Sequence, residues 1–321
     1  MGKGEEKGGS LALTVPLNYN RSMTTIYLSA GDSINEALSS APEGPVSIIL
    51  GEGVWKEKVT VTRADVTLIS ECGSVISWGD RHGMERDGKV MNTGESATFT
   101  VAAPSFTAIG VTFENSFDYP EAFRANEENE DGVRIDLQAV ALRTVFGADK
   151  SIFRSCTFLG WQDTLYLDSG TSSIEDSTIE GCVDFIFGSS PALFQGCEIV
   201  SRAKGVIAAP STYEGEEIGF IFHDCTFRRE SCVVDESVSL ARPWFPSGSV
   251  NRSPMMLLID CTLDGHIKSS LWEDMGTKKP GDREKTIHKA ADARFYISSQ
   301  EREDISGEEA DRYLSLIYSR L

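Results

Sequence analysis

The sequence predicts an all-β fold, a parallel β-helix in which short strands wind into stacked coils. Apolar triplets such as "VTF" and "CTF" recur along the chain, with first residues at positions 66, 111, 156, 177, 197, 225 and 261. The triplets are rich in Val, Ile, Thr and Phe and alternate in character, which favours strands over helical repeats. We interpret the spacing as a period of about 20–24 residues, sometimes doubled, with insertions in the later units.

Equivalent positions of successive coils stack into ladders about 4.8 Å apart in a solenoid of this kind. The first residues of the triplets are therefore predicted to form one inward ladder, which contains Val66, Val111, Cys156, Ser177, Cys197, Cys225 and Cys261. A small buried thiol suits such a position. Because the chain has seven cysteines and no CxxC motif, we expect reduced core residues with no disulfide, redox or metal role.

The open ends of a solenoid expose unpaired strand edges and need to be covered. Residues 33–38 begin with a capping box of Ser33 and Glu36, which predicts a short helix over the N-terminal end. Residues 305–321 begin with the same box, Ser306 and Glu309, and predict a helix on the outside of the solenoid or at its C-terminal end.

The rest of the sequence predicts two long turns, a single domain and a flexible N-terminal segment. The stretches 114–136 and 273–292 are charged and irregular, and we expect long turns there, where binding walls are usually built. A solenoid has no internal boundary, so residues 24–321 are predicted to form a single domain after a flexible N-terminal segment, residues 1–23.

Composition excludes several classes of partner. The net charge of −19 argues against nucleic acid and anionic membranes, and no apolar run approaches the roughly 20 residues of a membrane span. An acidic polymer whose acids are masked as neutral esters would be repelled less than an ionised one. The four histidines lack metal-site spacing, and no GxSxG serine-esterase motif occurs. The N-terminal residues do not resemble a signal peptide, so we expect a cytoplasmic protein as the sequence reads, or a secreted one if a signal was removed.

Two aspartates occupy the same position in successive coils. Asp163 lies seven residues after Cys156, and Asp184 lies seven after Ser177, so the two aspartates are 21 residues apart. Their Cα atoms should therefore be roughly 5 Å apart, with both side chains on one face. Stacked carboxyl groups split their pKa values, which is the requirement for a nucleophile beside a general acid.

Polar partners keep the same spacing. Gln138 lies 24 residues before Gln162, so two amide donors can stack beside the carboxylates and stabilise an oxyanion. Arg242 and Trp244 flank Pro243 and supply a cation and a flat apolar face.

Five motifs in order resemble the pectin methylesterases (pectinesterases), a family of carbohydrate esterases, over about residues 24–272. They are "GVWKEKV" at 53–59, "QAVAL" at 138–142, "GWQDTLY" at 160–166, "DFIFG" at 184–188 and "ARPW" at 241–244. The resemblance implies a right-handed parallel β-helix that hydrolyses the methyl esters of galacturonate units in pectin. It implies no cofactor and no metal, and we expect a monomer that acts on methyl-esterified homogalacturonan or its oligosaccharides.

The resemblance also implies a role for each site residue. Asp184 is the expected nucleophile, and Asp163 is the expected acid for departing methanol and then the base for water. Gln138 and Gln162 are the expected oxyanion donors, and Arg242 orients Asp184. Trp244, Trp161 and Phe185 are candidates for contact with the sugar chain.

The sequence departs from the family pattern at a few positions. Ala241 replaces the usual Gly, Trp55 replaces a usual Tyr, and Cys182 replaces another small residue. The last ~50 residues match the family pattern poorly. None of these changes removes a group expected to act in catalysis.

Other interpretations stay open from sequence. Asp163 taken alone is typical of a turn cap, the glutamines of a structural amide ladder, and Arg242 of a neutralising partner. A pectin lyase, a glycosidase or a non-catalytic pectin-binding module could share this architecture. The joint pattern of stacked acids, stacked amides and an Arg-Pro-Trp loop favours the esterase.

Overall fold

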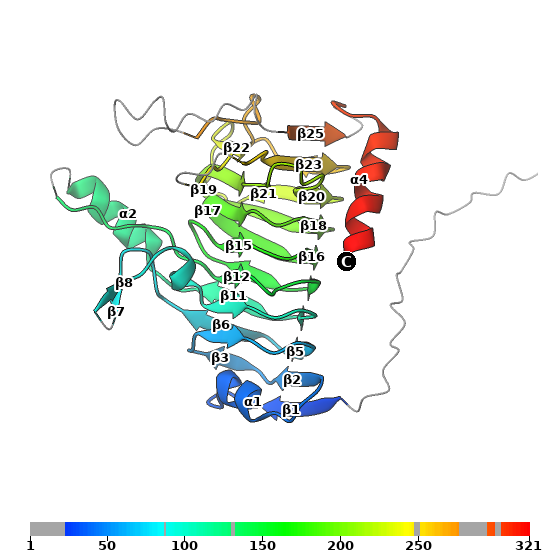
Figure 1. Cartoon of the computed structure of the whole chain (residues 1–321). Coiled ribbons are helices and arrows are strands. Elements are labelled where there is room, and N and C mark those ends of the chain that lie inside the picture. Colours follow the sequence, from blue (N-terminus) through cyan, green and yellow to red (C-terminus); the bar gives the residue numbers. More distant parts are fainter. Residues whose placement is uncertain (1–22, 87, 130–131, 247–250, 276–293, 299–302) are drawn as a thin grey trace, which may run out of the picture.

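The computed structural model describes residues 23–86, 88–129, 132–246, 251–275, 294–298 and 303–321. Figure 1 shows strands stacked one above another along a single axis. All pairings between strands of the coils are parallel, as a β-helix requires. The predicted fold class is confirmed.

The coils have three faces. The first face is a sheet of ten strands, β1 (Thr24–Leu28), β2 (Val46–Leu50), β5 (Val66–Ser70), β10 (Thr107–Ile109), β13 (Ser151–Arg154), β16 (Ser172–Glu175), β18 (Ala192–Gln195), β20 (Phe220–His223), β23 (Met255–Ile259) and β25 (Arg294–Ser298). The second contains β3 (Gly53–Trp55), β6 (Ser74–Trp78), β11 (Thr112–Asn115), β14 (Thr157–Leu159), β21 (Thr226–Arg229) and β24 (Thr262–Leu263). The third contains β4 (Val59–Val61), β9 (Phe99–Val101), β12 (Leu142–Thr144), β15 (Leu165–Leu167) and β22 (Val238–Ala241).

Two long strands bend from the second face onto the third. They are β17 (Thr178–Gly188) and β19 (Glu198–Pro210). Thr178 at the start of β17 pairs with Thr157 of the second face, and Ile186 near its end pairs with Leu165 of the third. The register of β17 against β19 shifts on both sides of Val183, where the strand turns the corner.

The long intervals between early triplets are single coils with insertions, so the interpretation of a doubled period was wrong. Thr67 pairs with Thr107, and Thr107 pairs with Ile152. The extra residues project from the solenoid between its second and third faces. Residues 79–98 contain the antiparallel hairpin β7 (Glu85–Arg86) and β8 (Lys89–Val90) and the 3₁₀ turn η1 (Gly94–Ser96).

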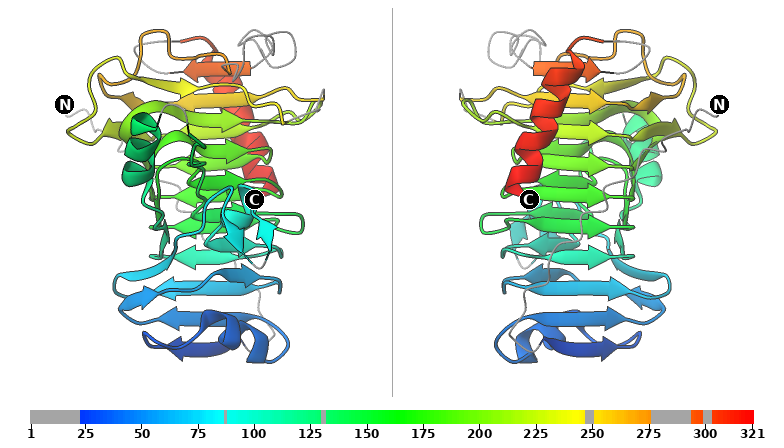
Figure 2. Two further views of the ribbon diagram at one scale, coloured as in Figure 1. Left: turned by 90° about the vertical axis from the view of Figure 1, so that its left-hand side faces the viewer. Right: turned by 90° about the vertical axis from the view of Figure 1, so that its right-hand side faces the viewer.

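The second insertion contains a helix where an irregular turn was expected. Helix α2 (Tyr119–Glu128) lies within residues 114–136. Asp118 accepts a hydrogen bond from the Glu121 N–H, and Pro120 lies in the first turn, both of which start a helix. Figures 1 and 2 show α2 and the β7–β8 hairpin on the same side of the solenoid. The other expected turn, 273–292, falls mostly outside the described residues.

The cysteine ladder is confirmed with one correction. Thr112, Thr157, Thr178, Glu198, Thr226 and Thr262 pair in one continuous register, so the residues that precede them stack as predicted. Val66 is the exception, because it pairs with Val46 on the first face. Ser74 takes the place below Val111. The error arose because strands on both faces share the same alternating pattern.

All seven cysteines are free. Burial raises the pKa of the Cys156 thiol to about 12, as expected for a reduced core residue. Stacked phenylalanines fill the rest of the interior; the rings of Phe113 and Phe158, for example, lie 5.7 Å apart.

Helices cover the N-terminal end and one outer face. In α1 (Ile34–Ser40), Ile34, Ala37 and Leu38 are buried against the first coils, and Ser33 accepts from the Glu36 N–H as predicted. In α4 (Gly307–Arg320), both hydrogen bonds of the Ser306–Glu309 capping box are present.

Helix α4 lies against the outside of the first face, the first of the two placements that the sequence allowed (Figure 2). Apolar residues that point outward from this face, Leu193, Ile221 and Leu257, receive Ala310 and Ile317 of the helix. No helix in the described ranges is long and apolar enough to cross a bilayer. Residues 1–22 lie outside them, so the flexible segment and the single-domain assignment stay predictions.

Candidate active site

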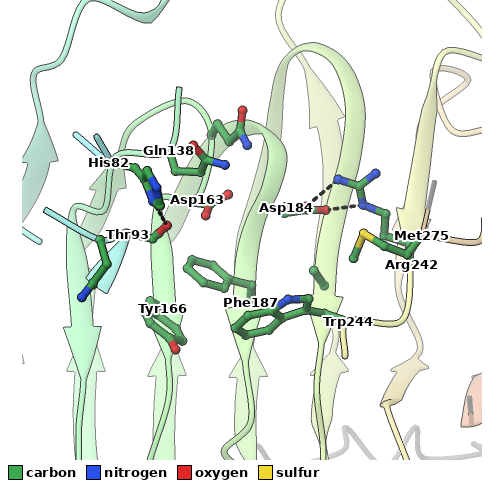
Figure 3. A pocket seen from close by; sticks show the side chains of 13 residues that line it. His82, Thr93, Gln138, Asp163, Tyr166, Asp184, Phe187, Arg242, Trp244 and Met275 are labelled. Carbon is green, nitrogen blue, oxygen red and sulfur yellow. Dashed lines mark hydrogen bonds and ion pairs between the residues drawn. The ribbon is translucent and has the colours of Figure 1, made fainter. Parts of the chain in front are cut away.

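A cleft of about 390 Å³ lies over the corner where β17 bends (Figure 3). It brings together six of the eight residues predicted from sequence, namely Gln138, Gln162, Asp163, Asp184, Arg242 and Trp244. The other residues that line it are His82, Asn92, Thr93, Tyr166, Phe187, Ala209 and Met275.

The two aspartates are stacked as the 21-residue spacing predicted. Gln138 pairs with Gln162, and Gln162 pairs with Val183, so Asp163 and Asp184 follow equivalent positions of successive coils. The Asp163 N–H donates to the Val183 carbonyl at 3.0 Å. Both aspartates have left-handed backbone angles, with φ of 66° and 48°. Asp adopts this conformation more readily than most residues, and the repeated turn presents both carboxyl groups to one cleft (Figure 3).

Arg242 binds Asp184 through two parallel hydrogen bonds. Its Nε donates to Oδ1 at 2.8 Å, and its Nη2 donates to Oδ2 at 2.6 Å. The backbone N–H of Arg242 donates to the Ala208 carbonyl, which fixes the loop after β22 against β19. Burial alone would lower the pKa of Arg242, but the adjacent Asp184 outweighs it and the pKa is raised. The pair is therefore a stable carboxylate–guanidinium ion pair.

The bidentate contact with Arg242 distinguishes the two carboxyl groups. Both aspartates are largely buried, with Asp163 8 % exposed as a whole residue and the side chain of Asp184 15 % exposed, and Arg242 donates to both carboxylate oxygens of Asp184. Burial disfavours the charged form of a carboxyl group, and a bidentate guanidinium favours it. The arrangement therefore suits Asp184 to act as the anion and Asp163 to act as the proton carrier.

The two glutamines lie beside the aspartates on neighbouring coils. The Oε1 atom of Gln138 is buried and has no hydrogen-bond partner within the described residues. Buried polar atoms are normally satisfied, so an amide left open in a cleft indicates contact with a ligand. The O and N atoms of an amide can exchange places by rotation, so either can face the ligand.

An aromatic wall closes one side of the cleft, and it differs from the wall predicted. Phe185 is fully buried in the core, so the prediction that it lines the groove was wrong. Phe187 lines the cleft instead, with its ring stacked 4.2 Å from Tyr166 and 5.6 Å from Trp244. The register shift between Val183 and Ile186 breaks the strand alternation, which turns Phe185 inward and Phe187 outward.

Trp161 was also predicted to contact the sugar chain, but it does not line this cleft. Its ring stacks with Tyr119 of α2 at 5.4 Å, and the Arg202 guanidinium lies over it at 3.9 Å. Trp161 therefore holds α2 against the coil that carries Gln162 and Asp163.

Sequence reasoning missed the wall contributed by residues 79–98. His82, Asn92 and Thr93 come from this insertion, whose only sequence signal was the long interval between two triplets. Tyr166 and Phe187, in contrast, lay inside the quoted motifs "GWQDTLY" and "DFIFG" and could have been singled out. No group of three metal-ligating side chains is placed to hold a metal ion in the described part of the chain.

Comparisons with known proteins agree on one family. A family model described as Pectinesterase matches residues 28–282. Pectinesterase A of Dickeya chrysanthemi is 32 % identical over 269 residues, which cover 77 % of this chain and 73 % of the relative. Pectinesterase 31 of Arabidopsis thaliana is 32 % identical over 257 residues, which cover 76 % of this chain and 73 % of the relative.

Solved structures give the same result. Pectin methylesterase PemA from Erwinia chrysanthemi superposes with a TM-score of 0.80 at 30 % identity and covers 90 % of this chain and 94 % of its own. The pectin methylesterase from Yersinia enterocolitica has a TM-score of 0.80 at 33 % identity, with 90 % and 99 % covered. A pectin methylesterase in complex with a hexasaccharide has a TM-score of 0.80 at 30 % identity, with 91 % and 96 % covered.

Proposed function

The chain belongs to the pectinesterase family, and from this premise we propose that it hydrolyses the methyl esters of galacturonate units in pectin, releasing methanol and de-esterified pectin. The observation that carries the proposal is the stacked pair Asp163 and Asp184 with Arg242 on Asp184. This arrangement supplies an anion and a proton carrier to the same point in one cleft.

In the first step a carboxylate oxygen of Asp184 attacks the ester carbonyl carbon. Arg242 keeps Asp184 ionised and fixes its orientation through the bidentate contact. The carbonyl oxygen becomes an oxyanion, which accepts hydrogen bonds from the amides of Gln138 and Gln162. The tetrahedral intermediate then breaks its bond to the methoxy oxygen, and Asp163 gives its proton to the departing methanol.

The second step returns the enzyme to its starting state. The galacturonyl group is now joined to Asp184 as an anhydride, and Asp163 is a carboxylate. Asp163 takes a proton from a water molecule, whose oxygen attacks the galacturonyl carbonyl carbon. Collapse of this intermediate releases the product as a carboxylic acid, which loses its proton to solvent to give galacturonate, and regenerates ionised Asp184 and protonated Asp163.

The cleft also suits a sugar polymer. Trp244, Phe187 and Tyr166 form an aromatic surface on which apolar sugar faces can stack. Substrate that enters as a neutral ester is repelled less by this acidic protein than the carboxylate product, and this difference favours product release.

The test is the identity of the product formed from highly methyl-esterified pectin. We expect free methanol in step with new carboxyl groups, and no ultraviolet-absorbing product. An unsaturated product would identify a lyase and new reducing ends a glycosidase. Polymer binding without any product would leave a non-catalytic module, and each of these three results would overturn the proposal.

A further inference from the structure

His82 is a titratable side chain in the cleft to which the mechanism gives no task. Its Nδ1 hydrogen-bonds to Thr93 Oγ1 at 2.9 Å, and its backbone N–H donates to the Gln138 carbonyl at 2.9 Å. These contacts fix the ring at the wall of the cleft (Figure 3). Within the described residues, Nε2 on the other side of the ring has no hydrogen bond, and His82 makes no ion pair.

The position of His82 separates it from the reacting ester. His82 belongs to the insertion after β6, Gln138 to the next coil, Asp163 to the coil after that, and Asp184 to the fourth. Coils rise by about 4.8 Å each, so the cleft follows the solenoid axis for several sugar lengths. A pectin chain that places one ester at Asp184 therefore brings a different sugar to His82.

We propose that His82 is a specificity-determining residue that, when protonated, binds the free carboxylate of a galacturonate further along the same pectin chain. The proposal rests on the esterase function proposed above and names its preferred substrate, pectin that is already partly de-esterified. An imidazolium donates from both ring nitrogens, so Nδ1 can keep Thr93 while Nε2 binds the substrate anion. A methyl ester at the same place has no charge to attract it.

Among the described residues, no charged side chain forms an ion pair with His82, so a carboxylate of the substrate can do so. Arg81 donates to the backbone carbonyl of His82 and lies over Phe117, and the Asp136 carboxylate lies against Gly83. Across the cleft are Asp163 and the Asp184–Arg242 ion pair. Elsewhere in the insertion, Asp80 pairs with Arg86 and with Lys58 of the preceding coil, Glu95 pairs with Lys89, and Glu85 is exposed in β7.

The sign of the pH dependence follows from ordinary imidazole chemistry. Imidazole is the side chain that ordinarily changes its charge between about pH 5 and pH 8, whereas uronates are ionised throughout this range. A bound carboxylate stabilises the imidazolium, so binding and protonation favour each other. The preference for partly de-esterified substrate should therefore increase as the pH falls from 8 to 5.

The test compares kcat/KM for methanol release from two oligogalacturonides of equal length, one fully and one half methyl-esterified, between pH 5 and pH 8. For the unmodified protein, the ratio of half to fully esterified substrate should rise about threefold to tenfold as the pH falls. His82→Asn keeps an amide where Nδ1 meets Thr93 but lacks Nε2, and its ratio should not change with pH. His223→Asn, a histidine that contacts Gln195 outside the cleft, is the matched control and should keep the original pH dependence.

A general loss of activity in a variant affects both substrates equally and cancels in the ratio. Salt at 0.5 M should weaken the preference for the half-esterified substrate, because it screens the charges. A ratio with the same pH dependence in His82→Asn as in the unmodified protein would overturn the inference while leaving the esterase function intact. Release of no methanol from either substrate by the unmodified protein would overturn both.

Discussion

Arg242 and Asp184 are 58 residues apart in the chain, and two parallel hydrogen bonds of 2.8 and 2.6 Å join them at the centre of the cleft. A carboxylate in a strand that otherwise reads as apolar would be costly without a partner. Here the partner comes from the loop after β22, two coils further along the solenoid. The ion pair accounts for the charge of Asp184 and leaves the carboxylate facing the cleft.

The catalytic rate should depend on the geometry of the Arg242–Asp184 pair more than on its charge alone. Arg242→Lys keeps a cation but cannot donate in parallel to both carboxylate oxygens, so we expect kcat to fall about 10- to 100-fold, and Arg242→Ala to lower it further. Steady-state kinetics of methanol release will measure this. A Lys variant with unchanged kcat would show that Arg242 only neutralises Asp184.

The glutamines should act on the transition state. Gln138→Ala and Gln162→Ala should each lower kcat about 10²- to 10³-fold with a smaller change in KM, because the oxyanion exists only after attack has begun. Gln195→Ala, which removes an amide on the outer surface, is the control and should leave both constants unchanged. An effect confined to KM would instead indicate ground-state binding.

Substitutions of two phenylalanines of β17 should affect stability in one case and substrate binding in the other. Phe185→Ala removes a fully buried ring and should lower the free energy of unfolding by about 3–5 kcal/mol. Phe187→Ala should chiefly raise KM for the polymer, because its ring faces the cleft beside Trp244. Denaturant unfolding and kinetics of both variants will test this, and a reversed pattern would contradict the placement of the two rings.

The buried thiols predict a loss of stability in alkali. Burial raises the pKa of Cys156 and of Cys182 to about 12, from an ordinary value of 9.0. The folded protein therefore holds these protons above pH 9, where the unfolded chain releases them. Their contribution is fully present below pH 9 and decreases as the pH rises toward 12.

Unfolding free energies between pH 8 and pH 11 will measure that decrease, and Cys156→Ala should make it shallower. Cys232→Ala, at an exposed thiol, is the matched control. An equal slope in all three proteins would exclude the thiols as its cause.

Much of the site could be predicted because its residues lie in the short, regular coils. Asp163 and Asp184 are separated by one uninterrupted coil, so counting residues was enough to stack them. Phe185 was misplaced because a bulge changes the alternation without any local sequence signal. His82 and Thr93 were missed because an insertion folds back over the cleft through contacts that residue spacing does not encode.

For other elements, the residue pattern alone did not show which face of the solenoid they occupy. Val66 and Val111 share one local pattern but belong to different faces, which only the strand pairing decides. The amphipathic stripe of α4 was visible in the sequence, and the outside of the solenoid was one of its two predicted placements. The stripe did not show that the helix packs on the outward side of β18, β20 and β23.

The most direct test of the account is the rate of methanol release by Asp184→Asn. The amide keeps the shape of the side chain but is not a nucleophile, so we predict a loss of at least about 10³-fold in a protein that still folds. Asp224→Asn changes another aspartate with left-handed backbone angles, away from the cleft, and should retain full activity. A folded Asp184→Asn protein that works within tenfold of the unmodified rate would contradict the assignment of Asp184 as the nucleophile.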